Sequence, residues 1–497
     1  MAFHTGSRGR GKVATVGQFL NNVCERFPEQ NVLNDYDRKQ KWTYRQWSLD
    51  SQQLVRELSS MSLEAGDFVM TRFGNDYGYL VAYGGVARAE GVIAPIGLRM
   101  TRKELGRLLA LVKPKWFLTS ASEWEEIEET VRQSSIVKIG IYTEGTWTWS
   151  DNTPFYPARK PDHSLAHLRF TSGSQGEPKI VALTHYNMIY RVGNFKHYAQ
   201  EGDVFYLSIP FVFRPDRLIQ AFSVGGEIVV ADTVYPEQLV RIWQEEKVTF
   251  AWLVPTIIGL LIQLTPEQIP ENLLLRGINT GGAYLYRHWE EKFEQLFGVP
   301  VYQQYGLSEG CVAFENPIEK RSGSVGKPTP SVQVRICDPD GKEVPAGEIG
   351  ELWYQGDNIM QGYLDRPDLT ADTLKDGWLR TGDMARFDKE GYLFIEGRLK
   401  DLIHSGGLKF SPREVEEVIL IYPGVQEVSV VPVSHKTKGE IAKAYFVADR
   451  LIRGSELRAF CRKYLADYKI PRQWKQVETL PKLASGKVAK RSVGQQN

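Results

Sequence analysis

The residues best suited to chemistry lie in one short stretch, residues 171–179, which reads TSGSQGEPK. Hydroxyl side chains, a lysine and backbone amides can surround phosphate oxygens, and glycine lets the backbone come close without a side chain intervening. A Walker-type loop needs four residues between its glycines and a helix after its lysine, and Gly173 and Gly176 are too close together for that. The stretch therefore favours a phosphate-binding loop of another kind, with a flexible turn rich in glycine and serine as the alternative.

The elements around this stretch must position it. Short apolar runs at 168–170 and 180–183 predict two strands, so the loop should close a hairpin. A capping-box pattern at 43–46 predicts the start of a helix. Further apolar runs are separated by polar or helical stretches, which predicts layered α/β structure with largely parallel sheets. These strand candidates are residues 68–72, 91–95, 116–119, 136–142, 227–231, 250–254 and 299–303.

The pattern of expected secondary structure changes toward the C-terminus. Residues 332–354 read as turn-rich β structure, and the last hundred residues read as a small α+β unit. In that unit Ser411 and Glu414 form a capping-box pattern around a proline at the first helical position. Strand candidates at 427–433 and 443–447 and a helix at 455–468 follow. We expect a large N-terminal domain, 1–399, made of layered α/β subdomains and a β-rich subdomain, and a small mobile C-terminal domain, 400–497.

Composition limits the classes of function. A chain of 497 residues is too long for one core, and its formal net charge of +1 argues against a nucleic-acid binder. The most apolar run, 250–264, is short and is broken by proline and glycine, so no membrane span is expected. The basic N-terminus, residues 8–12, reads as a solvated end rather than a transit peptide. Four widely spaced cysteines favour reduced thiols in a cytoplasmic protein over disulfides or a metal site: Cys24, Cys311, Cys337 and Cys461.

Several further stretches could complete a nucleotide site with the loop. Residues 281–283 (GGA) allow close backbone approach to a flat ring, and 302–309 (YQQYGLSE) place an aromatic ring, a hydroxyl and a carboxylate after a strand. Residues 381–383 (TGD) suit a pair of ribose hydroxyls, and Arg398 supplies a planar cation. Residues 481–487 present a lysine on a loop that contains glycine. Each alone has an ordinary structural explanation, such as a surface ion pair or a solvated lysine.

Together and in this order, these stretches resemble the adenylate-forming superfamily of acyl-CoA synthetases, nonribosomal-peptide adenylation domains and beetle luciferases. The resemblance covers roughly residues 15–495 and is strongest to acid–CoA ligases. It implies a two-step reaction with ATP, Mg²⁺ and coenzyme A as cofactors. A carboxylate first attacks the α-phosphate of ATP, giving an acyl-adenylate and pyrophosphate, and a thiol then displaces AMP.

The resemblance also implies roles for individual residues. Lys487 would bridge the substrate carboxylate and the α-phosphate, Ser308 would donate to the α-phosphate, and Glu309 would bind Mg²⁺. Tyr305 would stack on adenine, Asp383 would bind the ribose, and Arg398 would lie near the ribose and phosphates. The remaining ATP- or coenzyme-binding positions are Thr171, Ser172, Gly173, Ser174, Gly176, Lys179, Gly281, Gly282, Ala283, Gly406 and Gly407.

The small domain of this superfamily rotates between the two steps, and Lys400 matches the hinge. Glu414 matches only a helix cap. The sequence departs from the superfamily pattern at Gln175, where a hydroxyl is usual, and at Phe213, where many acyl-CoA synthetases have a histidine. No charged catalytic group is lost, so an active enzyme is expected.

The acid substrate is predicted only as a class. The pocket candidates are Phe211, Phe213, Arg214, Trp252, Tyr284 and Gln303. No aspartate lies where amino-acid-activating relatives bind the ammonium group, although Asp216 is close in sequence. This favours an aliphatic or aromatic acid without an α-amino group. A second carboxylate on the acid could pair with Arg214, although an exposed or ion-paired arginine is the simpler interpretation.

Three classes of function stay open at this point. The favoured one is an acid–CoA ligase. The second is a stand-alone enzyme that loads a separate carrier protein. The third is a luciferase-like oxidase or a nucleotide-binding protein without catalysis. The glycine at 406, where luciferases have lysine, counts against the oxidase.

Overall fold

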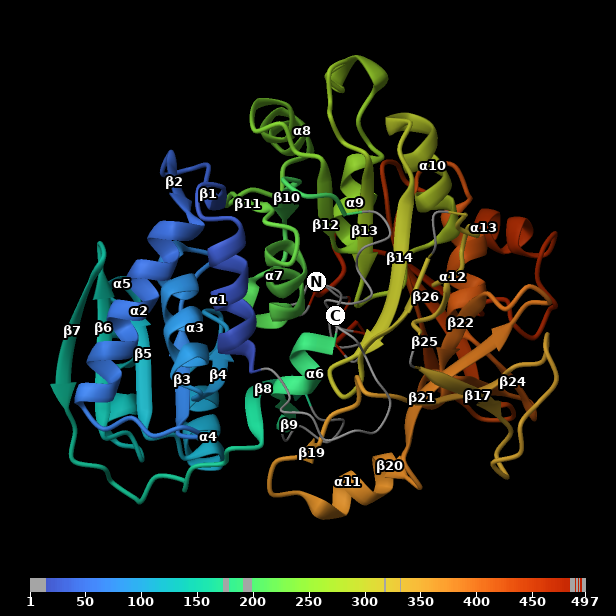
Figure 1. Cartoon of the computed structure of the whole chain (residues 1–497). Coiled ribbons are helices and arrows are strands. Elements are labelled where there is room, and N and C mark those ends of the chain that lie inside the picture. Colours follow the sequence, from blue (N-terminus) through green and yellow to red (C-terminus); the bar gives the residue numbers. More distant parts are fainter. Residues whose placement is uncertain are drawn as a thin grey trace.

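The computed structural model describes residues 15–172, 178–190, 199–316, 319–330, 332–482, 488, 490 and 492–493. Two large sheets lie side by side, with a β-rich region and a small C-terminal sheet at one end (Figure 1). This arrangement confirms the predicted α/β layers. It also confirms a large N-terminal part followed by a smaller α+β part.

Sheet B, one of the two large sheets, contains the predicted loop hairpin near one edge. The five central strands of this sheet are parallel neighbours, and the other three join antiparallel at its two ends. In spatial order they are β19 (Gly362–Tyr363), β9 (Pro178–Thr184), β8 (Leu165–Ser172), β4 (Val92–Ile96), β3 (Phe68–Arg72), β5 (Trp116–Ser120), β6 (Lys138–Thr143) and β7 (Thr146–Asp151). The helices of this half are α1 (Val16–Arg26), α2 (Tyr44–Ser60), α3 (Tyr77–Arg88), α4 (Arg102–Val112), α5 (Ala121–Arg132) and α6 (His185–Ile189).

Sheet A, the other large sheet, has six central parallel strands, with antiparallel strands at both edges. Its order is β16 (Lys327–Pro328), β15 (Cys311–Glu315), β14 (Val301–Leu307), β13 (Gly277–Gly281), β12 (Phe250–Leu253), β10 (Val204–Leu207), β11 (Glu227–Val230), β1 (Asn31–Asp35) and β2 (Gln40–Thr43). Its helices are α7 (Pro215–Phe222), α8 (Pro236–Glu245), α9 (Pro255–Leu261) and α10 (Arg287–Phe297).

Sheets A and B share one apolar core. Leu20 of α1, Trp47 of α2, Val181 of β9, Phe222 of α7 and Trp252 of β12 are all buried in the same cluster. Burying such large side chains is the main favourable contribution to folding, so the two halves form one folded unit. The C-terminal ends of the parallel strands in both sheets are the natural place for a ligand site.

The β-rich region and the C-terminal unit complete the chain. Sheet C consists of β17 (Gln333–Cys337), β18 (Gly350–Gln355), β20 (Leu374–Lys375), β21 (Trp378–Phe387) and β22 (Leu393–Arg398), with α11 (Pro367–Thr373) beside it. A 3₁₀ turn, Leu399–Asp401, leads into sheet D. Sheet D consists of β23 (Ile403–Ser405), β24 (Leu408–Phe410), β25 (Val425–His435), β26 (Gly439–Ala448) and β27 (Gln473–Gln476), with helices α12 (Pro412–Leu420) and α13 (Gly454–Cys461).

Two local predictions in the C-terminal unit were wrong. The Ser411 hydroxyl accepts a hydrogen bond from the Arg413 amide, and Glu414 pairs with Lys469, so Glu414 completes no capping box. The helix predicted at 455–468 ends at Cys461. Beyond it the chain tightens into turns with three-residue spacing, since the Lys463 amide donates to the Phe460 carbonyl at 3.0 Å.

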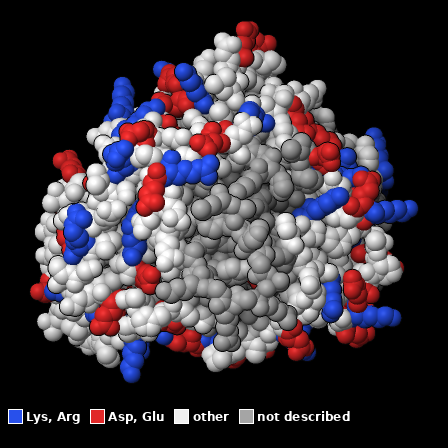
Figure 2. Space-filling model, in the orientation of Figure 1, with Lys and Arg blue, Asp and Glu red and all other residues white. Residues whose placement is uncertain are grey.

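The surface and helices add two general observations. On the face shown in Figure 2, basic and acidic side chains are interspersed over the residues that the structure describes. No helix within the described ranges has the length and apolar character needed to cross a bilayer.

Candidate active site

The loop predicted to bind phosphate closes a hairpin, as expected. Strands β8 and β9 are antiparallel, with Thr171 opposite Lys179, and the Thr171 hydroxyl donates to the Lys179 carbonyl at 3.4 Å. Gly173, Ser174 and Gly176 lie outside the described residues, as does the Ser172 side chain. The hairpin places Thr171 and Lys179 at the two ends of the loop.

A tyrosine from β19 connects Lys179 to the predicted metal ligand. The Lys179 ammonium lies 4.8 Å from the centre of the Tyr363 ring, and the Tyr363 hydroxyl donates to Glu309 Oε1 at 2.7 Å. Burial and then the neighbouring Glu309 carboxylate raise the pKa of Tyr363, so its hydroxyl stays protonated as a donor. Lys179 and Glu309, far apart in sequence, therefore lie at one place in the fold.

The surroundings of Glu309 fit a magnesium ion shared with phosphates. Its carboxylate is half-buried and is oriented by Tyr363, and the Met360 amide donates to its carbonyl oxygen at 2.7 Å. Within the described ranges, no three histidine, cysteine, aspartate or glutamate side chains gather where they could hold a metal. One protein carboxylate with phosphate and water oxygens is a set that Mg²⁺ accepts. Ser308, the neighbouring residue, is also half-buried.

A second connected group joins Tyr305, Asp383 and Arg398. The Tyr305 hydroxyl donates to Asp383 Oδ2 at 2.7 Å, and Arg398 Nε lies 2.7 Å from Asp383 Oδ1. Asp383 and Arg398 are opposite each other in β21 and β22, so the sheet register brings them together. Burial raises the pKa of Tyr305 well above its usual value. Tyr305 and Glu309 lie at one end of β14, so the two groups meet there.

Glycines 281 and 282 sit where β13 ends. A Cβ at Gly281 would lie 2.7 Å from the Gln304 carbonyl oxygen, so only glycine fits beside β14. Gly282 has a φ of +81°, a conformation that favours glycine. A Cβ added to Gly282 would lie 3.4 Å from Arg214 Nη1. Ala283, which follows, is half-buried.

The predicted pocket residues divide into two groups. Phe211 and Trp252 are buried, with ring contacts to Tyr79 at 5.6 Å and to Phe205 at 4.6 Å, respectively. Phe213 is 39% exposed beside Gly97, and Arg214 faces Asp216 at 3.4 Å. These four surround the start of α7.

The other two pocket candidates make their side-chain contacts elsewhere. The Gln303 amide donates to Glu290 of α10 at 2.7 Å, because alternate residues of β14 face opposite sides of sheet A. The Tyr284 hydroxyl donates to Glu417 of α12, and the Arg413 guanidinium lies 4.4 Å from the Tyr284 ring centre. Tyr284 thus belongs to the contact between the large domain and the C-terminal unit.

The C-terminal unit also holds the predicted hinge and coenzyme positions. Lys400 is exposed in the 3₁₀ turn, and Gly406 and Gly407 form the exposed turn between β23 and β24 with φ values of +61° and +84°. In Figure 1, β24 lies well away from the β8–β9 hairpin. Lys487 lies outside the described residues.

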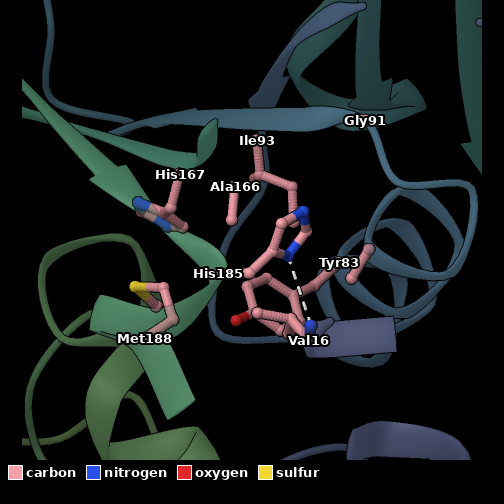
Figure 3. Close-up of a pocket in the computed structure, with 9 residues that line it drawn as sticks. Val16, Tyr83, Gly91, Ile93, Ala166, His167, His185 and Met188 are labelled. Carbon is pink, nitrogen blue, oxygen red and sulfur yellow. Dashed lines mark hydrogen bonds between the residues drawn. The ribbon is translucent and has the colours of Figure 1, made fainter. Parts of the chain in front are cut away.

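A small hollow in the N-terminal half is lined by residues of α1, α3, β4, β8 and α6. Figure 3 shows that His185 and Tyr83 line it, and that the Val16 amide donates to His185 Nδ1 at 3.2 Å. The hollow has no room for a water molecule. Burial lowers the pKa of His185, which agrees with a neutral imidazole that accepts this hydrogen bond.

Sequence reasoning missed Tyr363, Tyr79 and Arg169, which lie around the site. A tyrosine next to glycine at 362–363 is a weak signal, because nothing local places it beside Glu309. Arg169 lies in a strand recognised from its apolar neighbours. Its position two residues before Thr171 on the same strand was the available signal.

Comparison with known proteins agrees with this geometry. Residues 20–364 match the family model of the AMP-binding enzymes, and residues 414–487 match that of the AMP-binding enzyme C-terminal domain. A long-chain-fatty-acid–CoA ligase of Bacillus subtilis is 30% identical, with 96% of this chain and 93% of the relative covered. A sulfoacetate–CoA ligase of Cupriavidus necator is 29% identical, with 95% and 96% covered. The structure of ATP-bound MatB from Rhodopseudomonas palustris superposes with a TM-score of 0.84 at 24% identity, covering 96% and 98% of the chains.

The chain therefore belongs to the AMP-binding enzyme family, the adenylate-forming enzymes that the sequence motifs indicated. It is an AMP-forming acid–thiol ligase of the acyl-CoA synthetase type. Enzymes of this type use ATP, Mg²⁺ and coenzyme A to activate a carboxylic acid.

Proposed function

We propose that this enzyme forms its acyl-adenylate at the end of β14, between the two connected groups described above. The observation that carries the proposal is that residues 305–309 join them, through Asp383 and Arg398 on one side and Tyr363 and Lys179 on the other. A nucleotide needs a ribose partner and a phosphate partner at a fixed separation, and residues 305–309 connect the groups that supply them.

Each residue then has a chemical task. Thr171 and Lys179 hold the outer phosphates together with Ser172, Gly173, Ser174 and Gly176. Asp383 accepts from the ribose hydroxyls, and Gly281, Gly282 and Ala283 line the adenine slot with Tyr305. Ser308 donates to the α-phosphate, and Lys487 neutralises charge between that phosphate and the attacking carboxylate. Mg²⁺, bound by Glu309, supplies further positive charge to the phosphates.

The acid that we propose lacks an α-amino group. Asp216, the carboxylate nearest the expected ammonium position, is fully buried and lies among three arginines, Arg169, Arg214 and Arg217. A carboxylate already paired with guanidinium groups has little attraction left for an ammonium ion, and the arginines would repel it.

We further propose the cytoplasm as the location of this coenzyme A ligase. The described cysteines, Cys24, Cys337 and Cys461, are buried free thiols, which suits a reducing compartment. Loading of a separate carrier protein remains the alternative acceptor reaction. It would need a docking surface on residues 400–497, the domain that we propose to move about Lys400.

The acceptor is tested by mass spectrometry of the products. The purified enzyme is given ATP, Mg²⁺ and an activated acid, with either coenzyme A or a phosphopantetheinylated carrier protein. We expect acyl-CoA to form at least about tenfold faster than acylated carrier. Faster acylation of the carrier would move the assignment to the carrier-loading alternative.

Replacing Lys400 by proline should slow the thioester step more than adenylation. Proline fixes φ near −65° and removes the flexibility that a hinge needs. We expect the rate of acyl transfer to coenzyme A to fall about tenfold, with pyrophosphate release changed less than about threefold. The matched control is Lys389→Pro, in a turn of sheet C, and normal rates of both steps in Lys400→Pro would place the hinge elsewhere.

A further inference from the structure

A cluster of buried and half-buried arginines includes the pocket candidate Arg214 and is not used by the nucleotide. We call Arg169, Arg214, Arg217 and Asp216 the arginine cluster. Arg169 Nη2 lies 3.0 Å from Asp216 Oδ1, Arg214 Nη2 lies 3.4 Å from Oδ2, and Arg217 Nε lies 3.9 Å from Oδ2. Their side chains are 9%, 18% and 2% exposed, and that of Asp216 is fully buried.

The fold places the arginine cluster next to the reaction site, on the part of β8 that precedes the phosphate loop. Arg169 and Thr171 are two residues apart on β8, so they share one face of the sheet with a separation of about 7 Å. From the other side, Arg214 lies against Gly282, at the proposed adenine slot. The arginine cluster therefore lies next to Thr171 on one side and next to Gly282 on the other, where we expect the acid to bind.

The charges of Arg169 and Arg214 are not balanced by the bonds that they make. Both guanidinium groups share one carboxylate, and arginine keeps its charge at every physiological pH. Burying a cation without a full counterion costs free energy of folding, and binding of another anion offsets this cost. Asp216 fixes the orientation of both guanidinium groups and leaves other donor atoms of each available.

Two buried donors beside this part of the fold, one on Arg169 and one on the Tyr79 ring that packs on Phe211, have no partner among the described residues. One is Arg169 Nε, and the other is the hydroxyl of Tyr79, which is 1% exposed. The pKa of Tyr79 is raised by burial and by Tyr83 and is lowered by Arg169, which places these groups within electrostatic range of one another. Buried donors are nearly always paired, and an oxygen atom of a bound acid would pair these two.

We infer that the acid activated by this enzyme carries a second anionic group, a carboxylate or a sulfonate, which is bound by Arg169 and Arg214. This inference rests on the proposed function, because it assigns the far end of the acid that the site activates. Planar guanidinium groups suit both anions, since each offers two oxygens for paired hydrogen bonds. Tyr79 donates a further hydrogen bond to the same group.

The test compares matched pairs of acids in acid-dependent pyrophosphate release by the full chain. Each pair joins a doubly anionic acid to a singly anionic partner of similar size: succinate with butyrate, adipate with hexanoate, phthalate with 2-methylbenzoate, and 3-sulfopropionate with butyrate. We expect kcat/KM to favour the doubly anionic member of at least one pair by about tenfold or more. The carboxylate and sulfonate pairs decide between the two kinds of anion.

Two variants locate the effect. Arg169→Gln should lower kcat/KM for the preferred acid by at least about tenfold, with less than about threefold change for its singly anionic partner. Tyr79→Phe removes a hydroxyl that makes no hydrogen bond to a described residue, so we expect the variant to fold. Its preference for the doubly anionic acid should fall several-fold. The control is Arg276→Gln, which breaks an arginine–aspartate pair with Asp203 away from the arginine cluster and should keep the preference.

Each outcome decides the matter. Equal or better use of the singly anionic members by the unmodified enzyme overturns the inference and leaves the ligase assignment standing. A preference that survives in both Arg169→Gln and Tyr79→Phe overturns the assignment to this cluster. If neither member of any pair stimulates pyrophosphate release while pyrophosphate exchange into ATP is also absent, the proposed function fails as well.

Discussion

Replacing Lys487 by alanine should lower the rate of acyl-adenylate formation by about a hundred- to a thousandfold. A lysine between the attacking carboxylate and the α-phosphate stabilises negative charge that exists only in the transition state, and losing one such donor typically costs this much. Acyl transfer from a supplied acyl-adenylate to coenzyme A should change little, because the proposed domain movement takes Lys487 out of the site for that step. Single-turnover rates of the two steps are the measurement.

The matched control is Lys482→Ala in the same region. Lys482 makes an exposed ion pair with Glu427 at 2.9 Å, and such pairs contribute little to stability. Both rates should therefore stay within about twofold of those of the unmodified enzyme. Equal loss of both steps in Lys487→Ala would contradict the assigned role.

Replacing Asp383 by asparagine should lower kcat/KM for ATP by about 10- to 100-fold. The carboxylate is 3% exposed and holds Tyr305 and Arg398 at 2.7 Å each, in addition to its proposed ribose contact. Hydrogen bonds to a charged group contribute about 1.5–3 kcal/mol, which corresponds to this change in rate. The free energy of unfolding should also fall by up to about 3 kcal/mol, because Arg398 loses its counterion.

A variant of a second buried aspartate, Asp203, separates the effect on ATP use from the effect on stability. Asp203 is 5% exposed and pairs with Arg276 at 2.6 Å, at the start of β10. Asp203→Asn should destabilise the fold to a similar degree in urea unfolding and leave KM for ATP unchanged. A rise in KM for ATP in both variants would mean that Asp383 acts through stability alone.

Local structure was predictable where a few neighbouring residues decide it. The capping box of Thr43 and Gln46 does open α2, and the strands on either side of residues 173–177 do pair as a hairpin. Glu414 shows the limit of such patterns. Its carboxylate pairs with Lys469, which lies distant in sequence, and a local motif cannot anticipate that competing partner.

Sequence motifs predicted individual residues of the site, but the contacts between these residues could not be predicted. Asp383 and Arg398 were both singled out, yet their contact depends on the register of β21 and β22. Tyr363 reaches Glu309 because β19 pairs with β9, a pairing between two short segments with little sequence signature. Asp216 was considered as an ammonium ligand, and only the packing of α7 against β8 shows that arginines surround it.

The most direct test of the ligase assignment is acid-dependent pyrophosphate release from ATP, with and without coenzyme A. The acids should include fatty acids, benzoates, cinnamates, acids with two anionic groups, and amino acids beside their des-amino analogues. We predict that an acid without an α-amino group stimulates release and that coenzyme A accelerates turnover by consuming the acyl-adenylate. Absence of acid-dependent release across this panel, with ATP and Mg²⁺ present, would contradict the account.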